Sequence, residues 1–401
     1  MTSIGFLKTH RGLIYVSVGN LVGAAITGGF WLLLATIQTP DEYGTTNYGI
    51  AIASFSSFIV LLGLNTVATT YLAKGSTKIN IETNQLVFIS SIVVAVVISI
   101  LHDWMEGLIV IGMAFWMMSL YEALGKKLYK QYAIINIGAR GAQFALSIIL
   151  YFTMGVPGVV LGFSISFFLF SYRYFATIKH FNFRQFSEVK GLIKFASHNY
   201  SFNMANAFFM YFDKLVIVPL FGVTVLGFYQ FGFQFLMFLG MIPVSFYQYL
   251  LPEQSSSVAA KAAGGSSAAG SAKTRKVHIF GFLVSVGLAG LLFAVSPWIL
   301  HLLFPKFTGA VEVLRILSVG IVPMMVVWNL NARFVAENRT RSVPIGSAIY
   351  LIVQISLMVE LGYSMGAPGI AIATVLALVS QAVFLFLSSR LMVPQIITDK
   401  V

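Results

Sequence analysis

The sequence has few charged residues and no cysteine. Of its 401 residues only 9% are Asp, Glu, Lys or Arg, whereas a soluble domain has about 25%. Hydrophobic residues make up 58% of the chain. No water-soluble fold hides that much apolar surface with so few charges, so the composition excludes a soluble enzyme and predicts an integral membrane protein. The absence of cysteine excludes disulfide bonds, a thiol nucleophile and a cysteine-ligated metal site.

Acidic residues are especially scarce. The chain has 13 Asp and Glu against 25 Lys and Arg, which gives a net charge of +12. A charge of this size would suit a nucleic-acid-binding protein. In a membrane protein, however, Lys and Arg concentrate in cytoplasmic loops and lie well against anionic lipid. We therefore expect membrane lipids as partners and no nucleic acid.

Long stretches without any charged residue mark the expected membrane spans, because a helix needs about 20 apolar residues to cross a bilayer. They are Gly12–Pro40, Tyr43–Ala73, Gly141–Tyr172, Leu215–Pro252, Val277–Pro305 and Leu361–Ser389. Two turn signals, Gly155-Val-Pro-Gly158 and Gly366-Ala-Pro-Gly369, separate neighbouring helices. The sequence thus predicts an all-α membrane protein of twelve helices. They begin near residues 12, 46, 84, 105, 131, 156, 192, 222, 277, 309, 341 and 367. The fourth is the weakest, because only Gly107–Tyr121 is free of charge there.

The basic residues alternate with these spans. With the N-terminus placed in the cytoplasm, 21 of the 25 Lys and Arg fall in inner segments, whereas the outer loops hold only Lys306 among several acids. Positive residues favour the cytoplasmic side. This distribution predicts a multi-pass protein of the plasma membrane with both termini in the cytoplasm. The outer loops are short, so a large outer domain is not expected.

The expected domain organisation is two lobes of six helices. The first covers residues 1–180, a cytoplasmic connector covers 181–191, and the second lobe covers 192–401. A long inner connection at 253–276 lies within the second lobe. Its stretch Ser255–Ala272 is rich in Ala, Gly and Ser, a composition that predicts a flexible linker.

Short motifs repeat six helices apart. Gly12-Leu-Ile14 and Gly191-Leu-Ile193 precede the first and seventh helices, Gly44-Thr-Thr-Asn-Tyr-Gly49 and Gly227-Phe-Tyr-Gln-Phe-Gly232 open the second and eighth, and the two Gly-x-Pro-Gly turns precede the sixth and twelfth. An even number of spans gives both halves the same orientation. The repeat therefore predicts parallel halves with a transport site where they meet.

Polar side chains form stripes on the first, second, seventh and eighth helices. On the seventh helix, successive polar residues are spaced by 4, 3 and 7, which keeps them on one face. Such stripes favour a water-filled cavity, because polar groups in hydrocarbon must face protein or water. The alternative is hydrogen bonding between packed helices. We predict a substrate cavity lined by Asn20, Asn47, Asn65, Arg140, His198, Asn199, Asn203, Asn206, Asp213, Gln230, Gln234 and Gln248.

Few charges lie at membrane depth. Arg140 is about nine residues into the fifth helix, where it either binds a ligand or extends to the inner interface. Asp213 and Lys214 are adjacent, so they point about 100° apart on a helix and need not pair. Glu312 and Arg315 are spaced i, i+3, which favours an ion pair on one helix.

The chain has no recognisable catalytic or cofactor motif. Its six His residues lack metal-ligand spacing, no glycine loop suits a phosphate, and no serine or carboxylate constellation suggests catalysis. We therefore expect a protein that is not an enzyme and that needs neither a metal nor another cofactor.

The sequence resembles the polysaccharide or O-antigen (Wzx-type) flippases of the multidrug/oligosaccharidyl-lipid/polysaccharide (MOP) export superfamily. The resemblance rests on an Asp that starts an apolar run, a glycine turn, and Leu-Gly-x-Tyr at the next helix. The matching residues are Asp213-Lys-Leu-Val-Ile-Val-Pro-Leu-Phe-Gly222 and Val225-Leu-Gly-Phe-Tyr229, with Glu42-Tyr-Gly44, Tyr48 and Pro305 as further similar features.

This resemblance implies two six-helix lobes in a V around a central cavity lined by helices 1, 2, 7 and 8. It implies that a monomer flips a polyprenyl-linked oligosaccharide from the inner to the outer leaflet by alternating access, alongside glycan-assembly proteins. Cavity cations would contact the pyrophosphate, but this chain has mostly neutral amides there, with Arg140 as its main deep cation.

Two other functions remain open. An ion-coupled drug or metabolite antiporter of the same superfamily needs titratable acids within a lobe, and only Asp213 and Glu312 are expected at membrane depth. A membrane glycosyltransferase or ligase would use the same lipid-linked sugars, but such enzymes generally carry a sizeable outer loop or domain. Asp41 and Glu42 in the first outer loop are the one hint of such an enzyme.

Overall fold

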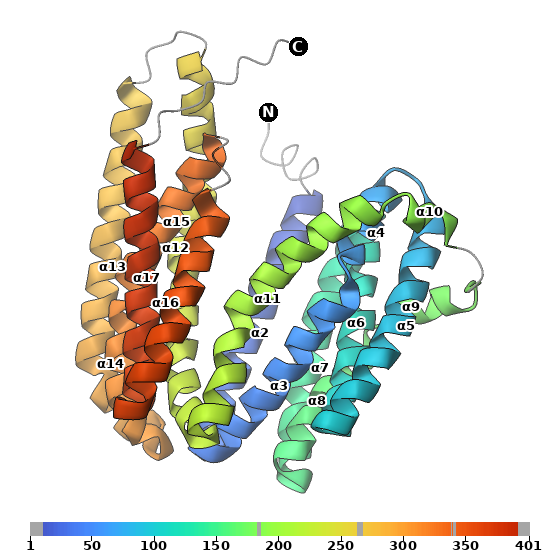
Figure 1. Cartoon of the computed structure of the whole chain (residues 1–401), viewed down its shortest axis with the longest axis horizontal. Coiled ribbons are helices and arrows are strands. Elements are labelled where there is room, and N and C mark those ends of the chain that lie inside the picture. The colour runs from blue at the N-terminus through green and yellow to red at the C-terminus, as the bar shows by residue number, and fades with distance from the viewer. Residues whose placement is uncertain (1–10, 183–185, 263–267, 338, 340–341, 392–401) are drawn as a thin grey trace. The chain divides into compact units, whose positions relative to one another are not determined.

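The computed structural model describes residues 11–182, 186–262, 268–337, 339 and 342–391. Over these ranges the chain is helical and has no strand, which confirms the all-α prediction. The residues group into two compact units. In Figure 1 most of unit 1 is coloured from blue to green, and most of unit 2 from green to red. Unit 1 comprises Met1–Ile37 and Thr45–Val216, and unit 2 comprises Gln38–Gly44 and Ile217–Val401.

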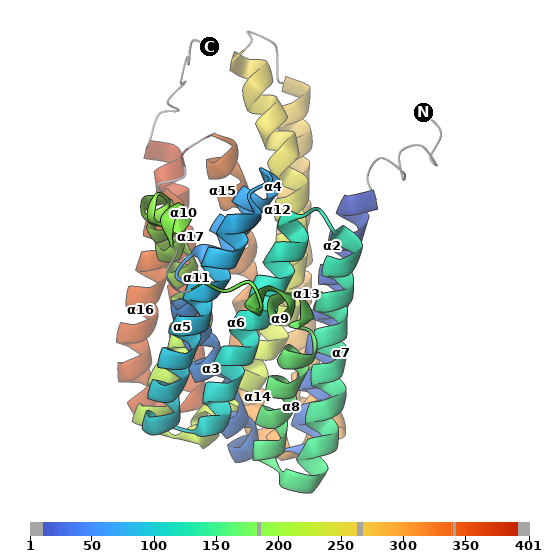
Figure 2. The same cartoon turned by 90° about the vertical axis from the view of Figure 1, so that its right-hand side faces the viewer.

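Unit 1 is a bundle of long helices with short ones at its ends. Helix α6 is central to it and packs against α4, α5, α7 and α8, while α2 packs on α7 (Figure 2). The helices are α2 (Arg11–Ile37), α3 (Pro40–Leu61), α4 (Leu64–Ala73), α5 (Thr77–Leu101), α6 (Trp104–Gly125), α7 (Tyr129–Met154), α8 (Val156–Leu169), α9 (Tyr172–Ile178), α10 (Ser187–Lys190) and α11 (Ile193–Phe221).

Unit 2 is a second helical bundle. Helices α16 and α17 form its most extensive packed pair, and α15 packs against α12, α13 and α17. Its elements are α12 (Val223–Ala262), α13 (Ala268–Leu303), the 3-10 helix η1 (Pro305–Ala310), α14 (Val311–Val319), α15 (Ile321–Ala336), α16 (Ser342–Met365) and α17 (Ala367–Leu391).

The described residues contain nine helices that are long and apolar enough to cross a membrane, or up to twelve if each of three bent pairs forms one span. The bend between α3 and α4 is 51°, and that between α8 and α9 is 60°. The upper number matches the twelve helices expected from the charge-free stretches. The chain is a multi-pass membrane protein.

The two Gly-x-Pro-Gly turns have the same geometry in the two units. Gly155 ends α7 with φ 66°, and Gly366 ends α16 with φ 63°, a left-handed conformation that glycine adopts without strain. Gly158 and Gly369 lie tightly against the backbone of the preceding helix, where a methyl group would collide with a carbonyl oxygen. The repeated motif therefore builds the same close helix pair twice.

The segment expected to be a flexible linker is largely helical. Helix α12 continues to Ala262 and α13 begins at Ala268, which leaves only 263–267 of the predicted linker 253–276 outside the described residues. Alanine is the best helix former, and extending an existing helix avoids the cost of a new nucleus. Composition alone therefore gave the wrong prediction here.

Helix α11 groups with unit 1 up to Val216 rather than with the second unit, in which the sequence placed it. It packs on α3 and α4 through ring contacts, with Phe55 and Phe208 5.1 Å apart between centroids. Gly63, at the bend between α3 and α4, has φ 73° and lies against the α11 backbone at Ala196 and Tyr200. These contacts bring the polar face of α11 onto unit 1.

Candidate functional site

The predicted polar stripes on α4 and α11 meet in unit 1. The amide of Asn203 donates a hydrogen bond of 3.1 Å to the side-chain oxygen of Asn65, which is only 2% exposed. This bond joins two packed helices, which is the alternative explanation of the polar stripes given above. Because Asn203 is only half-buried, its remaining amide atoms can still bond a ligand.

A second polar cluster joins α2 and α7. The side-chain oxygen of Asn20 accepts hydrogen bonds from the amide of Asn136 at 3.2 Å and from the hydroxyl of Tyr132 at 3.0 Å. Asn136 also donates to the carbonyl of Gly19 at 3.2 Å. Asn20 remains exposed, so this cluster presents hydroxyl and amide groups at the surface of unit 1. Tyr132 and Asn136 were not predicted.

Arg140 lies one turn further along α7, on the ring of Trp116. Its guanidinium carbon is 5.0 Å from the ring centroid, and one of its nitrogens donates to Gln143 at 3.1 Å. A guanidinium has five N–H donors, and a cation over a ring keeps its edge available to an anion. In the described part of the chain, Trp116 Nε1 is buried without a hydrogen-bond partner.

Tyr211 connects this cation to α3 and α11. Its hydroxyl interacts electrostatically with Arg140 and hydrogen-bonds Ser54. The site residues of α3, α7 and α11 are therefore neighbours in space although they are far apart in sequence. We call these neighbours the Arg140 cluster. Its residues are Ser54, Trp116, Arg140, Gln143 and Tyr211.

The other predicted residues of unit 1 are more scattered. Asn47 is buried in α3, and Asn199 donates to the carbonyl of Phe195 within its own helix at 2.7 Å. His198 is exposed. The side chain of Asn206 lies outside the described residues.

Asp213 and Lys214 pair, although their adjacent positions on the helix do not require it. The Lys214 Nζ atom lies 3.0 Å from Asp213 Oδ1 and also donates to the carbonyl of Met210 at 2.8 Å. Both residues are buried. The long, flexible lysine stem folds back along the helix, so the backbone angle between neighbouring residues does not prevent pairing. The pair is neutral as a whole, which makes Asp213 a poor free carboxylate for an ion.

The predicted glutamines of α12 do not form one site within the described residues of unit 2. Gln230 is 5% exposed, and its side-chain oxygen has no hydrogen-bond partner there. Gln234 is half-buried and Gln248 is exposed. Beside Gln230, the Tyr229 hydroxyl lies 3.0 Å from that of Thr374 in α17, a contact that the sequence did not suggest.

Three acids buried in unit 1 were missed. Glu82, Glu106 and Glu122 are each 5% exposed or less. They lie near the ends of α5 and α6, outside the charge-free stretches, where neighbouring helices bury them. The i, i+4 spacing of Glu122 and Lys126 was the available signal for one of them.

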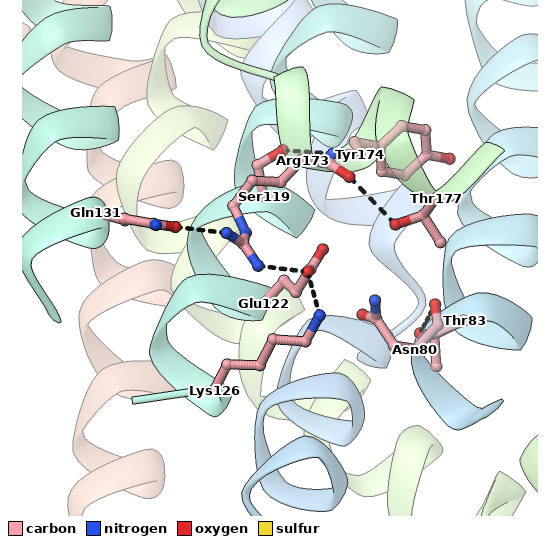
Figure 3. A network of polar contacts seen from close by, with 9 residues as sticks. All are labelled: Asn80, Thr83, Ser119, Glu122, Lys126, Gln131, Arg173, Tyr174 and Thr177. Carbon is pink, nitrogen blue, oxygen red and sulfur yellow. Dashed lines mark hydrogen bonds and ion pairs between the residues drawn. The ribbon is translucent and has the colours of Figure 1, made fainter. Parts of the chain in front are cut away.

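Glu122 is the shared acceptor in a network of ion pairs and hydrogen bonds between α6, α7 and α9 (Figure 3). Its Oε1 atom lies 2.7 Å from both Lys126 Nζ and an Arg173 guanidinium nitrogen, and Arg173 also donates to Gln131. The backbone N–H of Tyr174 donates to the Ser119 hydroxyl at 3.1 Å. This network fixes α9 after its bend. Arg173 and Lys126 thus have a structural role in addition to the topological one expected for them.

The chain resembles known transporters over most of its length. A model of the Lipid II flippase MurJ family matches residues 222–396. The structure "Lipid II flippase MurJ, inward closed conformation" is 14% identical, covers 94% of this chain and 87% of its own, and has a TM-score of 0.75. An inward-facing multidrug resistance MATE family transporter of the MOP superfamily is 14% identical, with 94% and 97% coverage and a TM-score of 0.66. The chain has the MOP superfamily fold.

An outward-facing MATE transporter of the MOP superfamily shares this fold too, with 15% identity, 94% coverage of both chains and a TM-score of 0.55. A search of curated proteins finds no match. The MOP fold agrees with the superfamily that the sequence resembled. The family whose model matches residues 222–396 is that of the Lipid II flippase MurJ, and the Wzx-type specificity that the motifs suggested stays a prediction.

Proposed function

We propose that the chain is a flippase that moves a polyprenyl-linked oligosaccharide from the inner to the outer leaflet of the plasma membrane by alternating access. The MurJ family match over 222–396 and the MOP fold support this proposal. We further propose cytoplasmic termini, a monomeric state and cooperation with glycan-assembly proteins.

The observation that carries the proposal is that unit 1 holds both the Arg140 cluster and the amide pairs. A sugar head group loses the hydrogen bonds of its hydroxyls in hydrocarbon, and amides such as Asn20 and Asn203 would replace them. Arg140 would bind the phosphate that joins sugar to lipid, since guanidinium and phosphate match in charge and geometry. The lipid tail would remain in the bilayer.

The alternative is an ion-coupled multidrug antiporter of the same fold. The buried carboxylate of Glu106 favours it, because intramembrane acids commonly relay protons in transporters. The MATE structures of the same fold are consistent with it as well.

A leaflet assay in proteoliposomes separates these functions. A lipid-linked oligosaccharide is supplied on one face and probed on the other with a membrane-impermeant reagent, and a fluorescent drug cation is tested in parallel. We expect protein-dependent movement of the lipid-linked sugar and no movement of the drug. Drug movement without sugar movement would replace the flippase proposal by the antiporter.

A further inference from the structure

A carboxylate and an imidazole face each other where α5 and α6 meet. His102 follows the last residue of α5, and Glu106 lies in the first turn of α6. The His102 Nδ1 atom is 2.7 Å from Glu106 Oε2. The Glu106 side chain is 6% exposed while that of His102 is 39% exposed, so one partner is buried and the other reaches solvent. The basic-residue distribution places this end of unit 1 on the outer side.

Helix α3 packs against this pair with Tyr48 and Gly49. Both residues belong to the repeated motif, whose role the flippase proposal does not explain. The ring of Tyr48 lies 5.3 Å from that of His102, edge to face. Gly49 makes room for the carboxylate, because a methyl group there would collide with Glu106 Oε1. The Tyr48-Gly49 end of the repeated motif therefore shapes a pocket for Glu106.

The second half of the chain shows that packing does not require this carboxylate. Gly232 is the repeat partner of Gly49, and a methyl group there would lie 2.9 Å from Val313 Cγ1 and 3.2 Å from Leu317 Cδ1. The same glycine position is thus covered by apolar side chains in unit 2. Burying a carboxylate costs more free energy than burying these aliphatic groups. Its presence in unit 1 therefore indicates a functional role.

We propose that His102 and Glu106 form a proton-binding site that couples transport to a proton gradient. In the empty state, His102 is neutral, its Nδ1 atom lies 2.7 Å from Oε2 of the Glu106 carboxylate, and the pair has a charge of −1. Hydronium from the outer water then gives a proton to Nε2: an N–H bond forms, an O–H bond of hydronium breaks, and the pair becomes neutral. The proposal rests on the proposed transport function and names its driving ion.

The residues around the His102–Glu106 pair do not compensate its negative charge. The other ionisable groups beside it are Tyr48 of α3 and Asp103 of the connecting turn, and Asp103 accepts a hydrogen bond from Met105 N–H as the α6 cap. No Lys or Arg pairs with Glu106 among the residues described. Losing the proton therefore leaves a buried, uncompensated negative charge, which favours a conformation that hydrates Glu106. That difference in free energy links proton binding to helix movement.

The test is the leaflet assay run with and without a pH gradient of one unit, acid on the face that bears His102. If one proton is coupled per cycle, the ratio of flipped to unflipped substrate rises about tenfold per unit. Glu106→Gln, which keeps shape and removes the charge, should abolish that rise while its melting temperature stays close to that of the wild type. A wild type that flips without responding to the gradient, or a Glu106→Gln variant that still responds, would overturn the proposal.

Two glycine substitutions provide a matched pair. Gly49→Ala forces the Glu106 carboxylate from its pocket and should lose the gradient response, whereas Gly232→Ala meets only movable apolar side chains and should keep it. Equal responses of both variants would contradict the site. If the wild type flips no lipid-linked sugar under any gradient, the flippase proposal fails instead. The coupling site is then tested on drug movement, where the same loss in Glu106→Gln is expected and an unchanged gradient response would reject it.

Discussion

The side chains of α11 illustrate how a polar residue in a membrane helix depends on its partner. Asn199 bonds a carbonyl of its own helix, while Asn203, one turn later, bonds Asn65 of another helix. Both belong to one stripe in the sequence. Only the second joins two elements.

Asn203→Leu should therefore reduce flipping strongly and stability slightly. The substitution leaves the buried oxygen of Asn65 without its donor, and a hydrogen bond between membrane helices contributes about 0.6 kcal/mol on average. Asn199→Leu, on the same helix, serves as the control and should flip nearly as well as the wild type. The comparison is made by the leaflet assay and by thermal melting in detergent, and equal flipping by both variants would remove Asn203 from the site.

Glu122→Gln should destabilise unit 1 markedly. Removing the carboxylate leaves Lys126 and Arg173 without their shared partner, and breaking a buried ion pair costs about 3–5 kcal/mol. Glu188→Gln removes an exposed partner of Lys78 and should cost less than about 1 kcal/mol. Both losses are measured as shifts of the melting temperature, and similar shifts would show that the Glu122 network is not structural.

At the scale of elements, the α3–α4 bend positions the face that α11 covers. Gly63→Ala combines a left-handed backbone with a collision against the Ala196 carbonyl. Gly75→Ala has a similar backbone, with φ 94°, but open space around it. A non-glycine residue in this conformation costs about 1–2 kcal/mol. We expect Gly75→Ala to lose about this much by thermal melting and Gly63→Ala to lose clearly more; equal losses would show that α11 does not press on the bend.

Most of the helical elements could be predicted from the sequence, because charge-free stretches and Gly-x-Pro-Gly turns act locally. The bends could not, since they depend on which helices pack across them. The linker prediction failed at Ser255–Ala272 because a composition rich in Ala, Gly and Ser suits both a flexible segment and the end of a long helix. The grouping of α11 with unit 1 depends on ring contacts such as Phe55 with Phe208, which pair residues far apart in sequence.

At the scale of the whole molecule, the charge alternation predicted twelve spans, and the motif resemblance implied the MOP fold. They were less informative about the site. Arg140 and the pair Asn65–Asn203 were among the predicted residues, but Trp116 and Tyr211 were not. An apolar-looking aromatic becomes part of a polar cluster only when another helix brings a cation beside it. Glu106 was not predicted for a similar reason: its partner His102 lies in a connecting turn, and only the packing of the helices brings the two together.

The most direct test of the central claim is flipping by Arg140→Gln compared with Arg315→Gln. Both arginines lie over an aromatic ring, Arg315 at 5.1 Å from Phe293 in unit 2, so the two substitutions remove a similar cation–ring contact. We expect Arg140→Gln to lose most protein-dependent flipping of a lipid-linked oligosaccharide, because the phosphate loses its guanidinium, while Arg315→Gln retains it. Normal flipping by a folded Arg140→Gln variant would contradict the account.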